Sequence, residues 1–165
     1  MRRIEVLGPV HDRPGFDCGV PALNRYLHET ARQHAEKGIA RSFVLVETAV
    51  PARILGFFSL SVCEIQSEYL PPRLAHKYPR LIPAARLARL AVAREHQRQG
   101  IGGLLMVDAM QRCLAVAESV GIVGLFVDAK DETVARYYAQ YGFIPLPDQV
   151  LTLFLPLAHL QQALA

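Results

Sequence analysis

The chain has 165 residues, of which 52% are hydrophobic, and a formal net charge of +3 from 18 Lys and Arg against 15 Asp and Glu. This length corresponds to about one domain of roughly 150 residues, so two catalytic domains are excluded and a single domain over residues 1–165 is expected. A chain of this size can bury about two-thirds of its unfolded surface. Its apolar content therefore argues against a disordered protein.

Hydrophobic periodicity predicts strands and one helix in the first part of the chain. Apolar residues recur every three or four positions after Val20, which is typical of one helix face, and Gly38 provides a helix end. Two β-rich runs then flank a turn and predict an antiparallel pair. The expected elements are a strand at 4–7, a helix at 20–37 and strands at 42–47 and 54–65.

The second part of the chain alternates strands and helices after a Pro-containing connection at residues 71–83. The expected elements are a strand at 86–92, a helix at 101–119, a strand at 122–127, a helix at 132–141, a strand at 150–155 and a short helical tail. Antiparallel strands followed by this alternation indicate a mixed sheet covered by helices, of the α/β or α+β class.

The cysteines, histidines and apolar runs exclude several other classes. Three widely spaced cysteines without a CxxC motif predict reduced, mostly buried thiols, and no two of the six histidines have the i, i+4 spacing of a helical metal site. No metal is therefore expected. The N-terminus lacks the unbroken apolar stretch of a signal peptide, and no run approaches the ~20 residues of a membrane span. The sequence therefore predicts a cytoplasmic protein.

Basic residues concentrate between Arg73 and Arg98, where seven basic side chains stand against one acid, Glu95, giving this window a charge of +6. Electrostatic fields act over about 8 Å at physiological salt. The local excess therefore indicates an anionic partner more directly than the whole-chain charge does. The structural alternative is a solvated basic loop.

A glycine-bearing turn, residues 97–103, follows the predicted strand 86–92 and opens the next helix. The unpaired N–H groups of a helix start and the helix dipole together favour bound anions. A Walker loop is excluded because no Lys follows the glycines, and a dinucleotide fingerprint fails because Leu105 occupies its third glycine position. A tight connection without a ligand is the alternative.

Two motifs together resemble a known family. Gln97-x-x-Gly100-x-Gly102 is preceded by Leu90-Ala-Val92 and followed by Tyr137-Tyr138-x-x-x-Gly142-Phe143. In this order and spacing they resemble the GCN5-related N-acetyltransferase (GNAT) superfamily over residues 85–145. The resemblance implies a GNAT-like α/β (α+β) fold with a mixed, mostly antiparallel central sheet flanked by helices.

The resemblance also implies how acetyl-CoA, the co-substrate, is bound. A splayed strand pair would let the pantetheine arm bond the main chain of residues 90–92, and the turn would hold the pyrophosphate. Asp131 stands where the family commonly has Asn, which puts that contact in doubt. The cofactor-binding residues implied are Leu90, Ala91, Val92, Gln97, Arg98, Gln99, Gly100, Ile101, Gly102, Gly103, Leu104 and Asp131.

The tyrosines of the helix 132–141 have two interpretations. With Val134 they have an i, i+3, i+4 and i+7 spacing, which predicts aromatic side chains packed on the core and which we favour for Tyr137 and Tyr141. Tyr138 stands where the superfamily often has the general acid that protonates the leaving thiolate, and a phenol with a pKa near ~10 can perform this step. Glu64 and His96 are candidate bases or water positioners, with ordinary surface or strand roles as the alternative.

Further motifs narrow the resemblance. Residues 16–19 (Phe-Asp-Cys-Gly), 23–27 (Leu-Asn-Arg-Tyr-Leu), 82–92 and 127–130 resemble the acetyltransferase toxins of bacterial type II toxin-antitoxin pairs. That resemblance implies acetylation of the α-amine of aminoacyl-tRNA, which blocks translation, neutralisation by a ribbon-helix-helix antitoxin, and compatibility with a homodimer. An α-amine with a pKa near ~8 is partly neutral in cells and needs no strong base.

The basic window fits such a substrate because phosphate contacts dominate binding to nucleic acids. The candidate tRNA-binding residues are Arg32, Lys37, Arg41, Lys77, Arg80, Arg86 and Arg89. Two alternatives remain open: an acetyltransferase for a small amine or a protein N-terminus, and a non-catalytic acyl-CoA-binding regulator.

Overall fold

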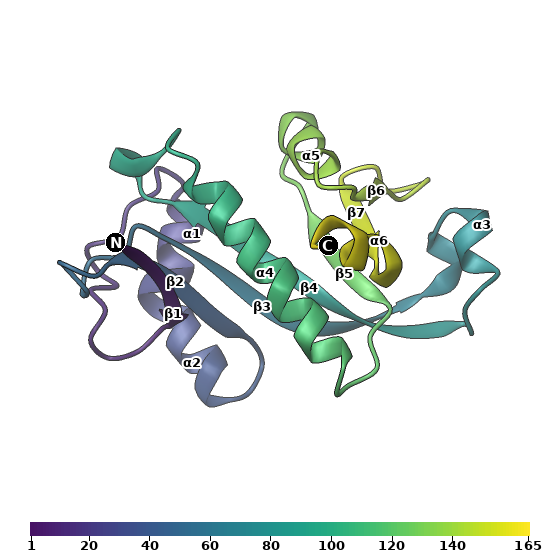
Figure 1. The fold of residues 1–165 in the computed structure, drawn as a ribbon, viewed down its shortest axis with the longest axis horizontal. Helices are drawn as coiled ribbons and strands as arrows, with labels where there is room; N and C mark the ends of the chain where they lie inside the picture. Colours follow the sequence, from purple (N-terminus) through teal and green to yellow (C-terminus); the bar gives the residue numbers. More distant parts are fainter. The chain divides into compact units, whose positions relative to one another are not determined.

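The computed structural model describes residues 1–165 (Figure 1). The chain forms two compact units: unit 1 contains residues 1–61 and 88–109, and unit 2 contains residues 62–87 and 110–165. Three long elements contribute to both units: β3 (Gly56–Gln66), β4 (Leu81–Val92) and α4 (Ile101–Ala117). The single domain expected from chain length stays a prediction.

Unit 1 holds the antiparallel strands expected near the N-terminus. Its other elements are β1 (Arg2–Val6), α1 (Pro21–Arg25), α2 (Ala31–Glu36) and β2 (Arg41–Glu47). β1 pairs with β2 so that Arg2 lies opposite Glu47, and β2 pairs with β3 so that Arg41 lies opposite Leu60. The predicted antiparallel pair is confirmed.

The helix expected at residues 20–37 is present but not uniform. Residues Tyr26–Thr30 form a π-helical turn between α1 and α2. The two buried residues of this wider turn are Tyr26 and Leu27, which pack into the core of unit 1. Gly38, with a φ of 71°, lies just past the helix end, as its position predicts.

Unit 2 contains the remaining elements: α3 (Pro72–Ala75), β5 (Gly124–Asp128), α5 (Glu132–Ala139), β6 (Ile144–Pro145), β7 (Thr152–Pro156) and α6 (Leu157–Ala163). β4 pairs with β5 in parallel over Ala85–Leu87. β5 and β6 both pair with β7 in antiparallel fashion. The short strand β6 was not expected from the sequence.

β4 begins at Leu81, five residues before the predicted strand, and so includes Pro83. Proline cannot donate to a strand ladder, but the Pro83 carbonyl accepts the Val123 N–H at 2.9 Å. Pro83 therefore contributes its carbonyl, the one main-chain hydrogen-bonding group that proline retains. The connection expected at residues 71–83 is accordingly shorter and contains α3.

The strands hydrogen-bond in the order β1-β2-β3-β4-β5-β7-β6. This mixed, mostly antiparallel sheet with flanking helices confirms the predicted fold class. No helix has both the length and the apolar character needed to cross a membrane.

Each unit has its own aromatic core. In unit 1 the Phe16 and Phe57 rings meet edge to face with centroids 5.4 Å apart. In unit 2 Phe126 and Phe154 stack with centroids 4.5 Å apart across the β5–β7 pair. Burial of each ring contributes about 1.5–3 kcal/mol, so these contacts fix the strands that carry the candidate site residues.

Candidate active site

The predicted phosphate-binding turn lies between β4 and α4 in unit 1. β4 ends at Val92, residues Arg94–His96 form a 3-10 turn, and α4 begins at Ile101. The Leu104 N–H donates to the Gly100 carbonyl at 3.2 Å. The N–H groups of the preceding helix positions have no acceptor in a regular helix. The first turn of α4 is therefore suited to an oxyanion.

Two residues of this turn have left-handed backbone conformations, Arg98 with a φ of 63° and Gly100 with a φ of 80°. A non-glycine residue there costs about 1–2 kcal/mol, so the turn holds Arg98 under local strain. No atom lies within 4 Å of the position that a Gly100 Cβ would occupy. Gly100 is therefore required for its backbone conformation, and no side chain blocks the approach of a ligand to its main chain.

Close packing against β3 fixes the position of the turn. A Cβ on Gly56 of β3 would lie 3.0 Å from the Ala91 carbonyl oxygen and 2.9 Å from Leu105 Cδ1. Only a residue without a side chain allows this approach. Gly56 thus permits the end of β4 and the start of α4 to pack tightly on β3.

Polar contacts tie the turn to the loop before α1. The Gln97 amide donates to the carbonyls of Cys18 and Val92, each at 3.0 Å. The Arg94 N–H donates to the Asp17 carbonyl at 2.9 Å. The Gly19 N–H bonds the Asp17 carboxylate and, with Asn24, lowers the pKa of Asp17. The loop is thereby organised around the turn.

Other predicted cofactor-binding residues of the turn differ in their exposure and in their hydrogen bonds. The Gln99 side-chain oxygen Oε1 accepts a hydrogen bond from Arg2 at 3.2 Å, Ile101 is buried and Leu104 is 48% exposed. The exposed Gln97 side chain thus holds the turn through the Cys18 and Val92 carbonyls, whereas the Ile101 side chain packs in the interior. A direct contact of Ile101 with a ligand would use its main chain.

Tyr138 and Tyr137 differ sharply although they are neighbours on α5 in unit 2. The Tyr137 hydroxyl lies 3.3 Å from the Tyr141 hydroxyl, and burial together with that contact raises the pKa of Tyr137. Tyr138 is 7% exposed and packs against Phe143 with ring centroids 5.9 Å apart. Burial raises the pKa of Tyr138 to about 12, so its hydroxyl stays protonated at neutral pH.

The Tyr138 hydroxyl forms no hydrogen bond within the chain. It also meets solvent, because the one buried side-chain nitrogen or oxygen without a partner is His96 Nδ1. The ring is therefore held by packing while the hydroxyl is free to donate, which is the arrangement a general acid needs. The spacing of the tyrosines could not distinguish these environments.

Asp131 has a local role at the start of α5. Its carboxylate accepts the Val134 N–H at 2.9 Å, the standard N-cap contact. A cofactor contact through this side chain would have to compete with the cap. That part of the predicted cofactor site stays a prediction.

The two candidate bases lie in different settings. Glu64 is exposed on β3 and forms no ion pair. His96 lies in the turn after β4 with its Nδ1 buried and without a hydrogen-bond partner. Neither arrangement assigns a proton-transfer role.

All three cysteines are free, as predicted. Burial raises the pKa of each thiol, to about 11 for Cys113, so none is an activated nucleophile. No group of three His, Cys, Asp or Glu side chains converges as a metal site would require.

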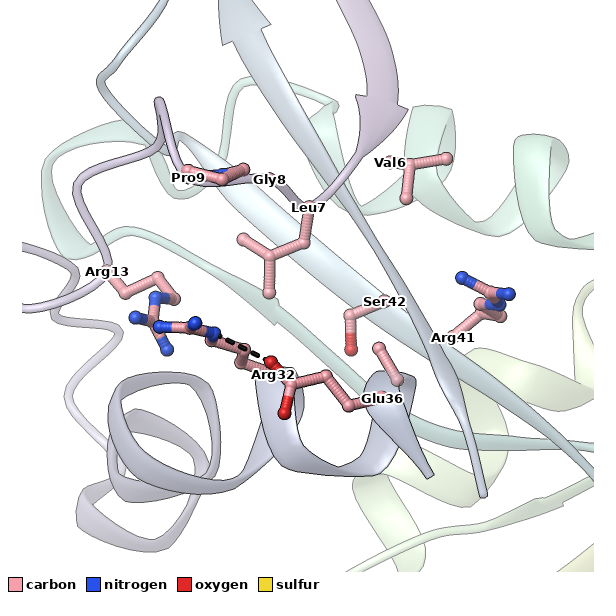
Figure 2. A pocket seen from close by; sticks show the side chains of 10 residues that line it. Val6, Leu7, Gly8, Pro9, Arg13, Arg32, Glu36, Arg41 and Ser42 are labelled. Atoms are coloured by element: carbon pink, nitrogen blue, oxygen red, sulfur yellow. Dashed lines mark hydrogen bonds and ion pairs between the residues drawn. The ribbon is translucent and has the colours of Figure 1, made fainter. Parts of the chain in front are cut away.

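The candidate tRNA-binding residues of unit 1 have unequal surroundings. Arg89 lies over the Tyr26 ring at 3.8 Å from its centroid, and Arg32 pairs with Glu36 at 3.0 Å. Lys37 and Arg41 are exposed and form no ion pair. Arg32 and Arg41 line one cavity together with Arg13, which the sequence did not single out (Figure 2).

Unit 2 holds the other three candidates. Arg86 pairs with Asp128, which also accepts a hydrogen bond from Thr152. Lys77 and Arg80 are exposed and unpaired. Lys77 lines a cavity of about 310 Å³ with Arg73 and His159. Arg73 already belongs to the basic window of the sequence, whereas His159 lies far from that window in the chain and joins it only in the folded structure.

A family model described as an acetyltransferase (GNAT) domain matches residues 39–145. The chain belongs to the GNAT acetyltransferase family. The match includes the turn at residues 97–104 and the helix with Tyr138, so this GNAT protein carries both motifs of the predicted resemblance within the matched region.

Two curated relatives of this GNAT protein are named as a probable toxin and a toxin. It is 31% identical to the probable toxin TacT of Sinorhizobium fredii, over 97% of this chain and 93% of the relative. It is 32% identical to the tRNA-acetylating toxin of Mycobacterium tuberculosis, over 87% of this chain and 85% of the relative.

Solved structures of AtaT have the same fold. AtaT complexed with acetyl-methionyl-tRNAfMet matches with a TM-score of 0.91 and 31% identity, covering 100% of both chains. AtaTR bound with acetyl-CoA matches with a TM-score of 0.82 and 30% identity, over 99% and 98%. An AtaT mutant bound to the C-terminus of the antitoxin AtaR matches with a TM-score of 0.82 and 32% identity, over 98% and 96%.

Proposed function

We propose that this GNAT protein transfers the acetyl group of acetyl-CoA to the α-amine of an aminoacyl-tRNA and thereby blocks translation. The observation that carries the enzymatic part is Tyr138, a buried phenol with a pKa raised to about 12 and an unbonded hydroxyl. The relative named as a tRNA-acetylating toxin and the structure of AtaT complexed with acetyl-methionyl-tRNAfMet support the choice of acceptor.

The turn supplies the binding part of the proposal. The open space beside Gly100 and the N–H groups of the first turn of α4 fit the pyrophosphate of acetyl-CoA. The main chain of residues 90–92 is the proposed partner of the pantetheine arm. When bound, acetyl-CoA supplies an acetyl thioester, and the chain's own contribution is to orient it through these main-chain groups.

Tyr138 is the proposed general acid. The incoming amine nitrogen forms the amide bond as the carbon–sulfur bond breaks, and the thiolate takes the Tyr138 proton. The amine loses its own proton to solvent, and the Tyr138 tyrosinate takes a proton from solvent, which restores the enzyme. Because an α-amine has a pKa near ~8, enough neutral nucleophile is present that the mechanism requires neither Glu64 nor His96 as a base.

The basic side chains without internal partners are the proposed contacts to the RNA backbone. Lys37, Lys77 and Arg80 carry charge that no carboxylate neutralises, which is the condition for phosphate binding and counterion release, and they lie outside the lining of the cavity that holds Arg41. Arg86 and Arg89 already have partners and would contribute less. A charged tRNA substrate places the reaction in the cytoplasm.

We further propose that a ribbon-helix-helix antitoxin neutralises the protein, as an antitoxin segment binds the relative AtaT. The homodimer implied by the toxin resemblance remains a prediction. A small upstream reading frame that overlaps this gene and has a ribbon-helix-helix pattern would support the pairing. Co-expression of that frame should abolish growth arrest.

The test is incubation of the purified protein with labelled acetyl-CoA and a pool of charged tRNAs. We expect acid-precipitable label on charged tRNA and none on the same tRNA after deacylation. Label transferred only to a polyamine or a protein N-terminus would replace the proposed acceptor. Binding of acetyl-CoA without transfer to any amine would favour the regulator.

A further inference from the structure

A cavity of about 320 Å³ lies in unit 1 between α2, the start of β2 and the residues that follow β1 (Figure 2). Four of the lining residues, Val6, Leu7, Pro9 and Ala35, are apolar. This volume falls at the lower end of the range of about 300–1,000 Å³ for ligand sites. The cavity can therefore hold one or two apolar side chains.

Guanidinium groups surround this apolar surface. Figure 2 shows Arg13 and Arg32 at one end of the lining and Arg41 at the other. Arg32 is paired with Glu36 at 3.0 Å, but the Arg13 and Arg41 side chains have no ion-pair partner. The cavity thus combines an apolar interior with two uncompensated positive charges.

The cavity begins where the edge strand of the sheet ends. β1 is the first strand in the order and pairs with β2 on one side only. Its last residue, Val6, is 52% exposed, and the next residues, Leu7 to Pro9, line the cavity. An exposed edge strand presents unpaired N–H and C=O groups that can pair with another extended chain.

These features favour a peptide over an RNA backbone. Phosphates would use the arginines but would gain nothing from an apolar interior, and the lining has no aromatic ring on which a base could stack. An extended peptide uses the strand edge, the apolar interior and the charges together. Charge complementarity requires that it carry carboxylates.

We propose that β1 and this cavity bind an extended acidic segment of a protein partner, with an apolar side chain in the cavity and carboxylates at Arg13 and Arg41. For the identity of the partner as an antitoxin, the proposal rests on the proposed function. Binding of the segment itself does not depend on acetyl transfer. The two can therefore fail separately.

The test is selection from a random nonapeptide display library on the full-length protein. We expect the enriched sequences to alternate acidic and apolar residues. Their binding should weaken at least tenfold in the Arg13→Ala/Arg41→Ala protein, since each substitution removes charge-assisted hydrogen bonds. The matched control is Arg25→Ala, which removes an exposed, unpaired arginine of α1 outside the cavity and should leave binding unchanged.

Amide chemical shifts locate the bound peptide. A selected peptide should shift resonances of residues 2–9 and 41–42, and an N-methylated version that cannot pair with an edge strand should bind at least tenfold more weakly. Lack of acidic enrichment, or equal binding by the double variant, would overturn the proposal. So would an acceptor-stem RNA whose binding needs Arg13 and Arg41 while acidic peptides bind elsewhere.

The outcomes also separate the two proposals. If peptides bind as expected but charged tRNA receives no acetyl group, the proposed function fails and the docking surface stands. If charged tRNA is acetylated but no acidic peptide depends on Arg13 and Arg41, the docking surface fails alone.

Discussion

The turn after β4 and the helix α5 carry chemistry in different ways. In the turn the groups that fit a ligand belong to the main chain, and the side chains of Gln97 and Ile101 serve to hold that main chain in place. In α5 the proposed chemistry depends on the surroundings of one side chain, Tyr138, whose neighbour Tyr137 has the same phenol in a different setting. Local motifs therefore predict both regions, whereas only the packed structure distinguishes the environment of Tyr138 from that of Tyr137.

The largest expected effect is that of Tyr138→Phe. Removal of a general acid lowers the rate by about 10²–10⁴, and the phenylalanine ring keeps the packing against Phe143. We therefore expect kcat for acetyl transfer to fall at least 100-fold with little change in thermal stability. The measurement is steady-state transfer to charged tRNA.

Tyr141→Phe is the matched control for that experiment, because it removes a hydroxyl that contacts only Tyr137. Its kcat should remain within a factor of two or three of wild type, since loss of one such hydrogen bond affects stability by about 1 kcal/mol. If the two variants lost activity equally, the distinction between the tyrosine environments would be wrong.

Gly100→Ala tests the turn. Alanine in this left-handed conformation costs about 1–2 kcal/mol, although its Cβ would meet no atom within 4 Å. We expect KM for acetyl-CoA to rise about tenfold while kcat changes little. Gly121→Ala is the control, because Gly121 also has open space around its Cβ position but no positive φ. An unchanged KM in Gly100→Ala would contradict the main-chain account.

The salt dependence of tRNA binding tests whether unpaired cations contribute more to RNA binding than paired cations do. Lys77→Ala should lower the slope of log K against log salt by about 0.9 for one lost phosphate contact. The double variant Arg86→Ala/Asp128→Ala removes an ion pair without changing net charge, and its slope should match wild type. A larger loss in the double variant would show that Arg86 contacts RNA despite its partner.

The smallest expected effect is spectroscopic. Because burial raises the pKa of Tyr138 to about 12, the folded state favours the neutral phenol. The associated stability is complete below a pH of about 10, the pKa of an unfolded tyrosine, and is lost as pH rises from there to about 12. A rapid-mixing difference titration of wild type against Tyr138→Phe should show one tyrosinate forming near pH 12. Formation near pH 10 would contradict the buried setting.

Local signals predicted much of this protein. The turn at residues 97–103, the helix that follows it and the antiparallel strands near residue 50 were all expected, because glycine placement and side-chain periodicity act over short distances. The GNAT family assignment, confirmed by the family model, followed from two such local motifs. The cofactor and tRNA contacts of individual residues remain predictions.

Long-range contacts account for what the sequence could not predict. The ion pair of Arg86 joins residues 42 positions apart, and Arg89 reaches the ring of Tyr26. These contacts show which cations of the basic window have partners within the protein. A count of charges cannot make that distinction. The π-helical turn at Tyr26–Thr30 and the extension of β4 through Pro83 likewise depend on packing and on a partner strand.

The most direct test of the account is the mass of the 3′-terminal aminoacyl-adenosine released by nuclease from charged tRNA after incubation with the protein and acetyl-CoA. The account predicts a product one acetyl group heavier, with the acetyl group on the α-nitrogen, for wild type and its near absence for Tyr138→Phe. Unmodified aminoacyl-adenosine after prolonged incubation with the active, acetyl-CoA-binding protein would contradict it.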